Sequence, residues 1–485
     1  MSISAALSNA NSGLAAASKR ASVVSNNVSN ALTPGFSRRE VSVSQRVLDG
    51  QGAGVIVNGV DRATDPALTS ERRSAEAALG RDQLTASTYA SFNSALGEPG
   101  DAFSLFSQFQ NLESSLRTLA ETPESQPMQE QVLSAAKSLA TSFNNLTDST
   151  QTARKNAESQ ISQQVSFVNS TLKQVDELND EISLASAGGR DASALEDQRS
   201  ILIDEISKII PVREVSRGNN KIDLITDEGV FLLAGDAREI TFTPANAVTP
   251  TASLANGELS GLTVNGADLT PGTGNSTSPK QGSLAGLFAV RDEIAPELQT
   301  KLDGLARDVI ERFENIDPTL APGEPGLFTD AGAALDGSQE AGLAERIEIN
   351  ALVDPDQGGE VWRIRDGFGA ASQGAAGNAD YIRSMLDSLT ALKAPPATTG
   401  VSGEVSAINA VANVTSAIGA ARISAEVSLA ATSARTQSVL DAENAATAVD
   451  TDQELQKLLV IEQAFAANAR VIQTVDRLMQ NLLEI

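Results

Sequence analysis

Apolar residues recur at alternating spacings of four and three at both ends of this 485-residue chain, and no other feature constrains its fold as much. Near the start the series includes Ile3, Leu7, Leu14, Val24 and Val28, with alanine at most of the other positions. A sustained pattern of this kind is typical of a helix that packs against another helix. Because alanine buries little apolar area, we expect the first helix to be marginal without a partner.

The last thirty or so residues repeat this spacing. The series comprises Leu458, Ile461, Phe465, Asn468, Ile472, Val475, Met479 and Leu482. Its one polar member, Asn468, either sets the register of a helix pair or lies at the rim of a slightly rotated helix. The sequence TDQE fits a capping box in which Thr451 caps the helix and Glu454 reaches back to the cap. A single stripe usually lies on its own domain, but matching stripes at both ends predict that the two terminal helices pair.

A strong stop signal, NNVSNALTPGFSR, follows the first helix. Pro34 lacks a backbone N–H and pushes Thr33 toward extended geometry, so the helix must end before them. Gly35 provides the positive φ that a Pro-Gly turn needs. Asn27 and Asn30 are poor in a helix interior but bind backbone groups well near a helix end. The segments REVSV and GVIVNGV that come next alternate as the strands of a short hairpin do.

Composition and charge argue against several classes of function. The chain has no cysteine and no histidine, which removes disulfides, thiolates and the commonest metal ligand and general base, although carboxylate or serine chemistry stays open in principle. A net charge of −26 opposes binding to phosphate backbones and anionic lipids, and no stretch is apolar enough to span a bilayer. We therefore expect no enzyme activity, no cofactor, no metal, no nucleic-acid partner, no membrane partner and no cleaved signal peptide.

The first fifty residues differ from the rest of the chain in charge. They hold five basic residues and two acidic ones, in a protein that is otherwise strongly acidic. The basic residues are Lys19, Arg20, Arg38, Arg39 and Arg46. Such a group is usually a solvated face, and the alternative is electrostatic docking to acidic neighbouring subunits.

Between the two ends, helical and strand-like segments alternate. Residues 129–184 contain neither Pro nor Gly and hold one apolar seam, which predicts a long helix. Residues 212–285 carry short runs such as KIDLIT and VFLLAG around a DEG turn, followed by many Gly, Pro, Thr and Ser, which predicts strands and exposed loops. Helical patterning returns from Leu284 to about residue 315 and again over 404–446.

These patterns predict a mainly α, elongated multi-domain protein with an inserted β region. The N- and C-terminal helices pair as a coiled coil, a helical domain forms the middle, and a small β domain lies outside. The predicted boundaries are 1–62 with 446–485 for the terminal assembly domain, 63–211 with 286–445 for the helical middle domain, and 212–285 for the β domain.

Both ends also resemble one known family. SGLAAASKRASVVSNNVSNALTPGFSR resembles the N-terminal signature of bacterial flagellar rod, hook and hook-associated proteins, and LLVIEQAFAANARVIQTVDRLMQNLLEI is similar to their C-terminal signature. Phe36 departs from the tyrosine that hook-associated members often carry, and hook proteins commonly have phenylalanine there. The segments 194–215 and 282–314, which look like internal helices of the hook-associated members, therefore carry the choice between them.

The resemblance implies a structural protein of the bacterial flagellum, secreted and located at the hook–filament junction. It implies self-association in a ring or helical tube, type III export, an export chaperone at the C-terminal helix, and two neighbours, the hook protein and the second hook-associated protein. Alternatives are the hook protein itself, a secreted adhesin or a surface hydrolase built on an axial-protein scaffold.

Seam and signature together predict two sets of assembly residues. The N-terminal set is Ile3, Leu7, Leu14, Val24, Asn27, Val28, Asn30, Thr33, Pro34, Gly35, Phe36, Ser37 and Arg38. The C-terminal set is Leu458, Ile461, Phe465, Asn468, Arg470, Ile472, Val475, Met479 and Leu482.

Overall fold

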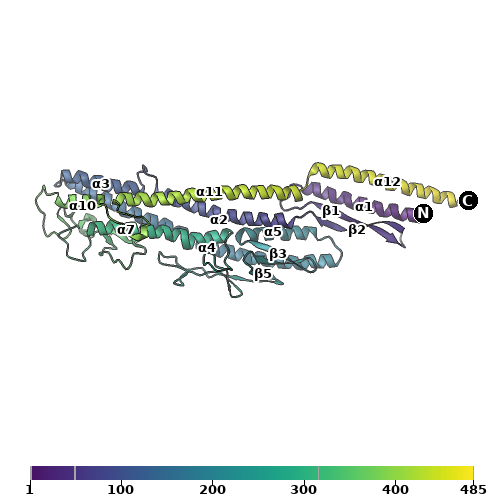
Figure 1. Ribbon diagram of the computed structural model, residues 1–485, viewed down its shortest axis with the longest axis horizontal. Helices are drawn as coiled ribbons and strands as arrows, with labels where there is room; N and C mark the ends of the chain where they lie inside the picture. The colour runs from purple at the N-terminus through teal and green to yellow at the C-terminus, as the bar shows by residue number, and fades with distance from the viewer. Residues whose placement is uncertain (1–2, 49–50, 315, 484–485) are drawn as a thin grey trace. The chain divides into compact units, whose positions relative to one another are not determined.

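The computed structural model describes residues 3–48, 51–314 and 316–483, and this part of the chain is mainly helical with a few small sheets (Figure 1). The mainly α fold with inserted strands confirms the predicted fold class. Contacts divide the chain into two compact units. The first comprises residues 1–79, 166–240 and 432–485. The second comprises residues 80–165 and 241–431.

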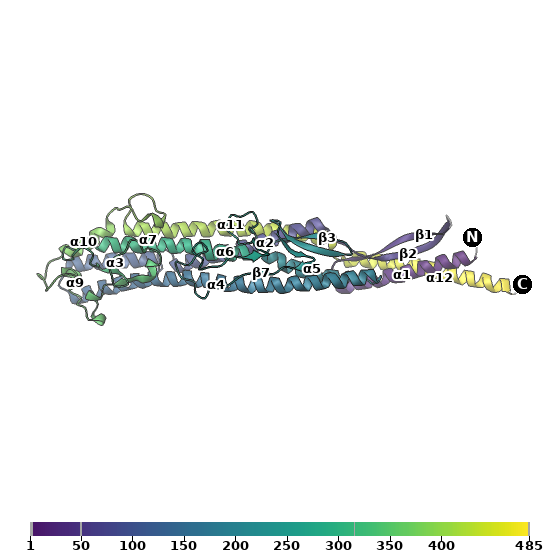
Figure 2. The same cartoon turned by 90° about the horizontal axis from the view of Figure 1, so that it is seen from below.

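The two ends of the chain meet in the first unit. Helix α1 (Ile3–Asn30) packs along helix α12 (Thr451–Leu483), and the two helices lie side by side in both views (Figures 1 and 2). Strands β1 (Arg39–Leu48) and β2 (Gln51–Arg62) form an antiparallel hairpin that packs against α1. The pairing of the terminal helices and the hairpin are confirmed.

A small antiparallel sheet belongs to the same unit. Its strands, in the order β3-β4-β5-β6, are β3 (Val212–Arg217), β4 (Lys221–Thr226), β5 (Phe231–Ala234) and β6 (Asp236–Ala237). It follows helix α5 (Ser193–Ile209). The buried amide of Asn179 donates to the carbonyl of Ile222 at 2.9 Å and accepts from its N–H at 3.2 Å, which fastens β4 to the preceding long helix. The hairpin predicted around the DEG turn is confirmed as β4 and β5.

Three long helices contribute residues to both units. They are α2 (Pro66–Leu96), α4 (Gln126–Ala187) and α11 (Ala407–Thr447). The structure confirms the two long helices predicted over 129–184 and 404–446. Each is extended or trimmed by only a few residues at its ends.

The second unit has a core of Leu and Phe side chains. Its longer helices are α3 (Leu105–Glu121), α6 (Ser283–Ala289), α7 (Ala295–Glu314) and α10 (Asp380–Thr390). The rings of Phe109 and Phe143 meet edge to face at 6.2 Å, as do those of Phe313 and Phe328 at 5.2 Å. A π-helical turn over Val290–Ile294 joins α6 to α7, so the predicted helix from Leu284 is present. Its predicted end at residue 315 lies outside the described residues.

Shorter elements complete the fold. The strands are β7 (Ile240–Thr241), β8 (Thr263–Val264), β9 (Ala267–Asp268), β10 (Phe328–Asp330) and β11 (Ile347–Ile349). The short helices are α8 (Leu343–Arg346) and α9 (Arg363–Asp366), with 3-10 turns at Ala351–Val353, Pro355–Gln357 and Ala397–Thr399. Within the described ranges, no helix has both the length and the apolar character needed to cross a bilayer.

The segment 212–285, predicted as one inserted domain, has its residues in both units, with the division after Ile240. The three predicted domains stay a prediction that deletion experiments can test.

Candidate assembly site

Helices α1 and α12 run antiparallel, and a glycine and an asparagine fix their register. A Cβ atom added to Gly13 would lie 2.9 Å from both the Nδ2 and Oδ1 atoms of Asn468, so the amide occupies the space that glycine leaves. Asn468 is half-buried, and its Nδ2 also donates to the carbonyl of Ala464 at 3.0 Å. Of the two interpretations of Asn468, this contact favours a position in the seam.

A buried asparagine joins three elements of the site. Asn27 has no exposed surface; its Nδ2 donates to the carbonyl of Arg39 at 2.8 Å and to Oε2 of Glu454 at 2.9 Å. Its Oδ1 accepts from the N–H of Arg39 at 3.0 Å. One side chain therefore connects α1 with the start of β1 and with the first turn of α12. Glu454 is buried as well and accepts from Nζ of Lys457 at 2.7 Å, so the polar network is well satisfied.

The start of α12 corrects the predicted capping box. Oδ1 of Asp450 accepts from the N–H groups of Asp452 at 3.0 Å and Gln453 at 3.2 Å, so Asp450 is the cap and Thr451 is the first helical residue. Asp caps at least as well as Thr, which allows the helix to begin one residue earlier than predicted. Glu454 consequently turns toward Asn27 and does not reach back to the cap.

The stop signal forms the predicted turn. Helix α1 ends at Asn30, and the N–H of Phe36 donates to the carbonyl of Thr33 at 3.2 Å across Pro34 and Gly35. The φ of Gly35 is +76°, which other residues adopt at a cost. A Cβ there would also lie 2.5 Å from Cγ1 of Ile201. Gly35 is thus required twice, by its backbone conformation and by its close approach to α5.

The residues after the turn place β1 beside the end of α11. The N–H of Arg38 donates to the carbonyl of Thr447 at 3.0 Å. The guanidinium of Arg39 lies 4.8 Å from the centre of the Phe36 ring, and Oγ of Ser37 accepts from Arg62 at 3.4 Å. The signature segment therefore positions the hairpin by local contacts. All of these contacts of Phe36, Ser37 and Arg38 are made within one copy of the chain.

An aspartate on α5 pairs with two arginines of the hairpin, an arrangement that the sequence reasoning missed. The carboxylate of Asp197 lies 2.8 Å from Arg39 and 2.7 Å from Arg62, and all three side chains are largely buried. Of the five basic residues among the first fifty, Arg39 therefore has a largely buried acidic partner elsewhere in the chain.

A second aspartate, seven residues along α5, repeats this pattern. Asp204 lies 2.8 Å from Arg72 and 2.6 Å from Arg73. Burial lowers the pKa of Arg72, but the carboxylates of Asp204, Glu76 and Glu443 outweigh burial and raise it overall. A spacing of seven puts Asp197 and Asp204 on one face of a helix. This spacing was the sequence feature from which a row of ion pairs along α5 could have been predicted.

The N-terminal set of predicted residues is only partly buried. Val24 is buried, while Ile3, Leu14, Val28, Asn30, Phe36, Ser37 and Arg38 are half-buried. Leu7, Thr33, Pro34 and Gly35 are exposed. Asn30 donates to the carbonyl of Asn26 at 2.9 Å, which makes it a local cap.

The C-terminal set is more exposed still. Val475 is buried, Ile461, Asn468 and Ile472 are half-buried, and Leu458, Phe465, Arg470 and Met479 are exposed. The register places Met479 at about the level where α1 begins, which explains its exposure. The side chain of Leu482 lies outside the described residues. The assembly role of both sets stays a prediction.

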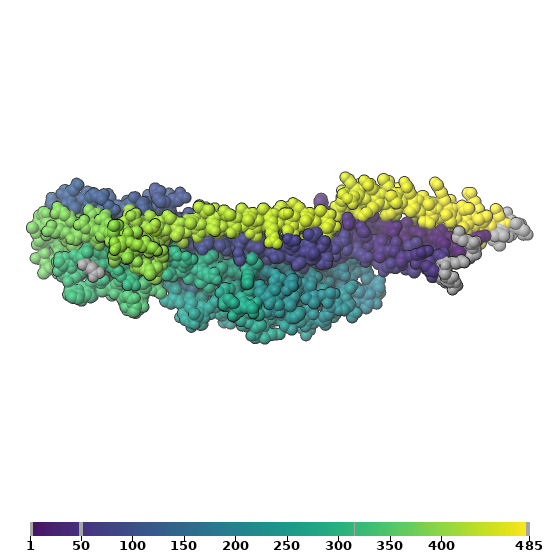
Figure 3. Space-filling view, in the orientation of Figure 1, coloured from purple at the N-terminus to yellow at the C-terminus, as the bar shows by residue number. Residues whose placement is uncertain are grey.

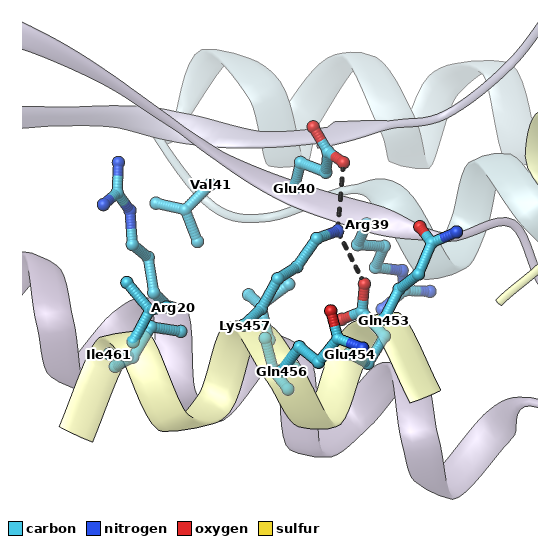
Figure 4. A pocket seen from close by; sticks show the side chains of 12 residues that line it. Arg20, Arg39, Glu40, Val41, Gln453, Glu454, Gln456, Lys457 and Ile461 are labelled. Atoms are coloured by element: carbon cyan, nitrogen blue, oxygen red, sulfur yellow. Dashed lines mark hydrogen bonds and ion pairs between the residues drawn. The ribbon is translucent and has the colours of Figure 1, made fainter. Parts of the chain in front are cut away.

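A groove of about 670 Å³ lies between α1, β1 and the start of α12 (Figure 4). Apolar side chains from all three elements line it, among them Val23, Val41 and Val460. Nζ of Lys457 lies in it, 2.7 Å from Glu454 and 3.4 Å from Glu40. Among the described residues no group of acidic side chains is arranged to hold a metal ion.

Helix α12 leaves much of its apolar surface uncovered. The outer side of this helix, in yellow in Figure 3, has no other part of the chain over it. Eight large apolar side chains on it are between 37% and 65% exposed. They are Leu455, Leu458, Leu459, Val460, Phe465, Val471, Leu478 and Met479. A helix that is apolar on several sides is normally buried, so this surface indicates contact with other molecules.

Comparison with known families agrees with this geometry. The model described as "Flagellar hook-associated protein FlgK helical domain" matches residues 89–319. "Flagella basal body rod protein" matches 7–36, and "Flagellar basal body rod FlgEFG protein C-terminal" matches 445–485, so the terminal matches cover α1 and α12. The chain is thus similar to FlgK proteins over its helical middle and to flagellar basal body rod proteins at both ends. FlgK proteins are flagellar structural proteins, and the family is not one of enzymes.

The individual relatives are distant. It is 26% identical over 323 residues to flagellar hook-associated protein 1 of Salmonella typhimurium, a match that covers 64% of this chain and 56% of that protein. It is 23% identical over 521 residues to flagellar hook-associated protein 1 of Bacillus subtilis, with 98% and 97% covered. The hook junction protein FlgK from Burkholderia pseudomallei superposes with a TM-score of 0.44 at 20% identity, covering 54% of this chain and 47% of that one. The chain thus spans little more than half the length of the Salmonella relative.

Proposed function

We propose that this protein is a structural component of the bacterial flagellum that self-assembles at the tip of the hook and joins hook to filament. Similarity to FlgK proteins supports the flagellar role. The single observation that carries the self-assembly is the uncovered apolar surface of α12 beside a firmly registered helix pair. Burial of such side chains contributes about 1.5–3 kcal/mol each, which is the main favourable term available to an assembly of these subunits.

The finer parts of the proposal concern partners and route. Copies of the chain form a ring or helical tube outside the cell, between the hook protein on one side and the second hook-associated protein on the other. Export proceeds through the flagellar type III apparatus, and a chaperone covers α12 before assembly. The exposed leucines and valines of α12 support a chaperone, because such a surface invites aggregation while it is uncovered.

The test is a chain that ends at Arg470, expressed in a strain that lacks the gene. The deleted part carries Ile472, Val475 and Met479, which lie along the α1 seam or just past its end. We expect a complete loss of filament growth, with the second unit folded as before by circular dichroism and denaturation. Normal motility from the truncated chain would contradict the proposal.

Two controls sharpen this test. The amount of truncated protein in the culture medium separates failed assembly from failed export, since a chain that is exported but not incorporated lacks only the assembly contact. The deletion strain itself separates the junction role from that of the hook protein. Complete hooks that shed flagellin monomers support a junction protein, and absent hooks support a hook protein.

A further inference from the structure

Helix α12 carries a second heptad seam besides the one that meets α1. This seam consists of Val460, Ala464, Ala467, Val471, Thr474 and Leu478, again at spacings of four and three. All six side chains are exposed. At 3.6 residues per turn the second seam lies roughly a quarter of a turn around α12 from the line through Ile461 and Asn468. A sustained heptad spacing of this kind is typical of a face that packs against another helix.

A third apolar face lies on roughly the opposite side of α12 from the second seam. It comprises Leu455, Leu458, Leu459, Glu462 and Phe465, all of them exposed. This face differs in composition from the second seam, since it has larger side chains and an acidic residue at its centre. One helix thus presents two unlike, uncovered apolar faces on either side of α1.

The second seam begins in the groove between α1, β1 and α12. Val460 lines that groove together with Val23, Val24 and Val41. Arg20 also lines it, beside Ile461 and away from the ion pairs of Lys457 (Figure 4). No hydrogen bond or ion pair joins Arg20 to any residue that the structure describes.

Arg20 in the groove and Glu462 on the third face have opposite charges and lie at the same level along the helix pair. Glu462, on the third face, likewise has no hydrogen-bond or ion-pair partner within the described part of the chain. The register set by Gly13 with Asn468 and by Asn27 with Glu454 places Arg20 level with about residue 461. A second copy set beside the first without axial displacement would therefore bring its Glu462 to the height of Arg20.

We propose that the groove and second seam of one copy receive the Leu455–Phe465 face of α12 from a second copy, with Arg20 paired to that copy's Glu462. This inference rests on the proposed self-assembly and assigns its contact surfaces. Because the two faces are unlike, each copy can bind one neighbour on either side, and such a contact builds rings or helical arrays instead of closed pairs.

The exposed, polar side of α1 from a second copy is a less suitable partner for the second seam of α12. Its exposed positions are mostly serine and asparagine, among them Ser4, Asn11, Ser18, Ser22 and Ser25. These side chains offer no apolar surface to the second seam. The third face of α12 provides both large apolar side chains for the second seam and a carboxylate, Glu462, for Arg20, whereas Glu40 and Glu454 in the groove already pair with Lys457.

The absence of cysteine from the chain allows a direct test. The double variant Arg20→Cys with Glu462→Cys is expressed in the deletion strain, and isolated hook–filament structures are treated with a mild oxidant. We expect a ladder of dimers, trimers and larger species on a non-reducing gel. The matched control pairs Ser22→Cys, on the polar side of α1, with Glu462→Cys and should give no ladder. A motile strain without a ladder, or with dimers alone, overturns the proposal.

Charge reversal provides a second measurement. Arg20→Glu and Glu462→Arg, each alone, should lower the number of filaments per cell several-fold, and the two together should restore most of the loss. Failure of the double variant to recover overturns the pairing, even where the wild-type gene restores motility and the proposed function stands. Failure of the wild-type gene to restore filaments would instead contradict the proposed function. Reduced export of the single variants, with no ladder from the cysteine pair, would assign the surface to the export chaperone and overturn the contact between copies.

Discussion

The terminal helix pair and the core of the second unit use apolar residues in opposite ways. In the second unit, large side chains such as Leu112, Leu116, Phe143 and Leu302 are completely buried. In the terminal pair, the buried apolar residues of α1 are alanines and valines, and most large side chains of α12 are exposed. The second unit therefore contains its own stabilising burial, whereas the terminal pair depends on what covers α12.

This difference indicates that different residues of the chain stabilise the free subunit and make its assembly contacts. A subunit that must be held ready for assembly needs a surface whose burial is delayed until neighbours arrive. The polar network of Asn27 and the fit of Asn468 on Gly13 give α1 and α12 a defined register without much apolar burial. Substitutions in the two regions should accordingly have very different effects on the free chain.

The largest expected effect is in the core of the second unit. Phe143→Ala removes a fully buried ring that packs on Phe109, and it should lower the free energy of unfolding by about 3–5 kcal/mol. Chemical denaturation of the free chain, followed by circular dichroism, measures this loss. Phe103→Ala is the matched control, because Phe103 lies in the same unit but is highly exposed, and it should change stability by less than about 0.5 kcal/mol. Equal losses of stability from both variants would contradict the claim that the second unit is stabilised by its buried side chains.

Much of this contrast could be predicted from the sequence. Heptad spacing identified α1 and α12 and their pairing, and the Pro34 signal located the end of α1. The uncovered second seam of α12 was missed because the sequence analysis followed one apolar series along the helix, the one that pairs with α1, and did not look for a second. Glu454 was assigned to a capping box because a local motif was present, while its actual partner, Asn27, lies 427 residues away in the chain. The pairs of Asp197 were missed for the same reason, since a charge pattern does not reveal partners that only the fold brings together.

The polar network at the start of α12 should matter next most. Asn27→Ala leaves the carboxylate of Glu454 and the backbone of Arg39 without their buried partner, which costs roughly 1–3 kcal/mol. Hydrogen exchange on the free chain should show amides of α1 and α12 exchanging about ten- to a hundredfold faster. Amides of α3 should not change, and neither should those of the control Asn11→Ala, an exposed position on the same helix. A loss of protection that spreads equally to α3 would show that the two regions are not energetically separate.

The second unit should also respond to pH through Asp303. Burial raises the pKa of Asp303 to about 6, although its carboxylate accepts hydrogen bonds from the N–H groups of Gly342 at 2.8 Å and Ala344 at 2.9 Å and from Gln299 at 2.9 Å. Because this pKa is above the ordinary value of 3.8, the folded state binds the proton more tightly than the unfolded state. The contribution of this group is fully present below about pH 4 and is lost as pH rises through about 6.

The comparison that isolates this effect is with Asp303→Asn, which cannot titrate. Between pH 7.5 and pH 5, the unfolding free energy of the wild type should gain about 1–1.5 kcal/mol relative to the variant. Denaturation at both values measures it, and parallel behaviour of the two proteins would contradict the raised pKa. Hydrogen exchange of α1 and α12 should be insensitive to the substitution, which keeps the test within the second unit.

The smallest effect on the free chain is expected on the uncovered side of α12. Leu459 is 60% exposed, so Leu459→Ala removes little buried area, and alanine favours the helix at least as well as leucine. Its free energy of unfolding should stay within about 0.5 kcal/mol of the wild type, an order of magnitude less than Phe143→Ala changes it. The same substitution should reduce filament number in the deletion strain, because burial of a leucine contributes about 1.5–3 kcal/mol only once a neighbour covers it. A variant with unchanged stability and unchanged filament number would show that this face of α12 stays in water after assembly, and the exposed leucines would then need another partner.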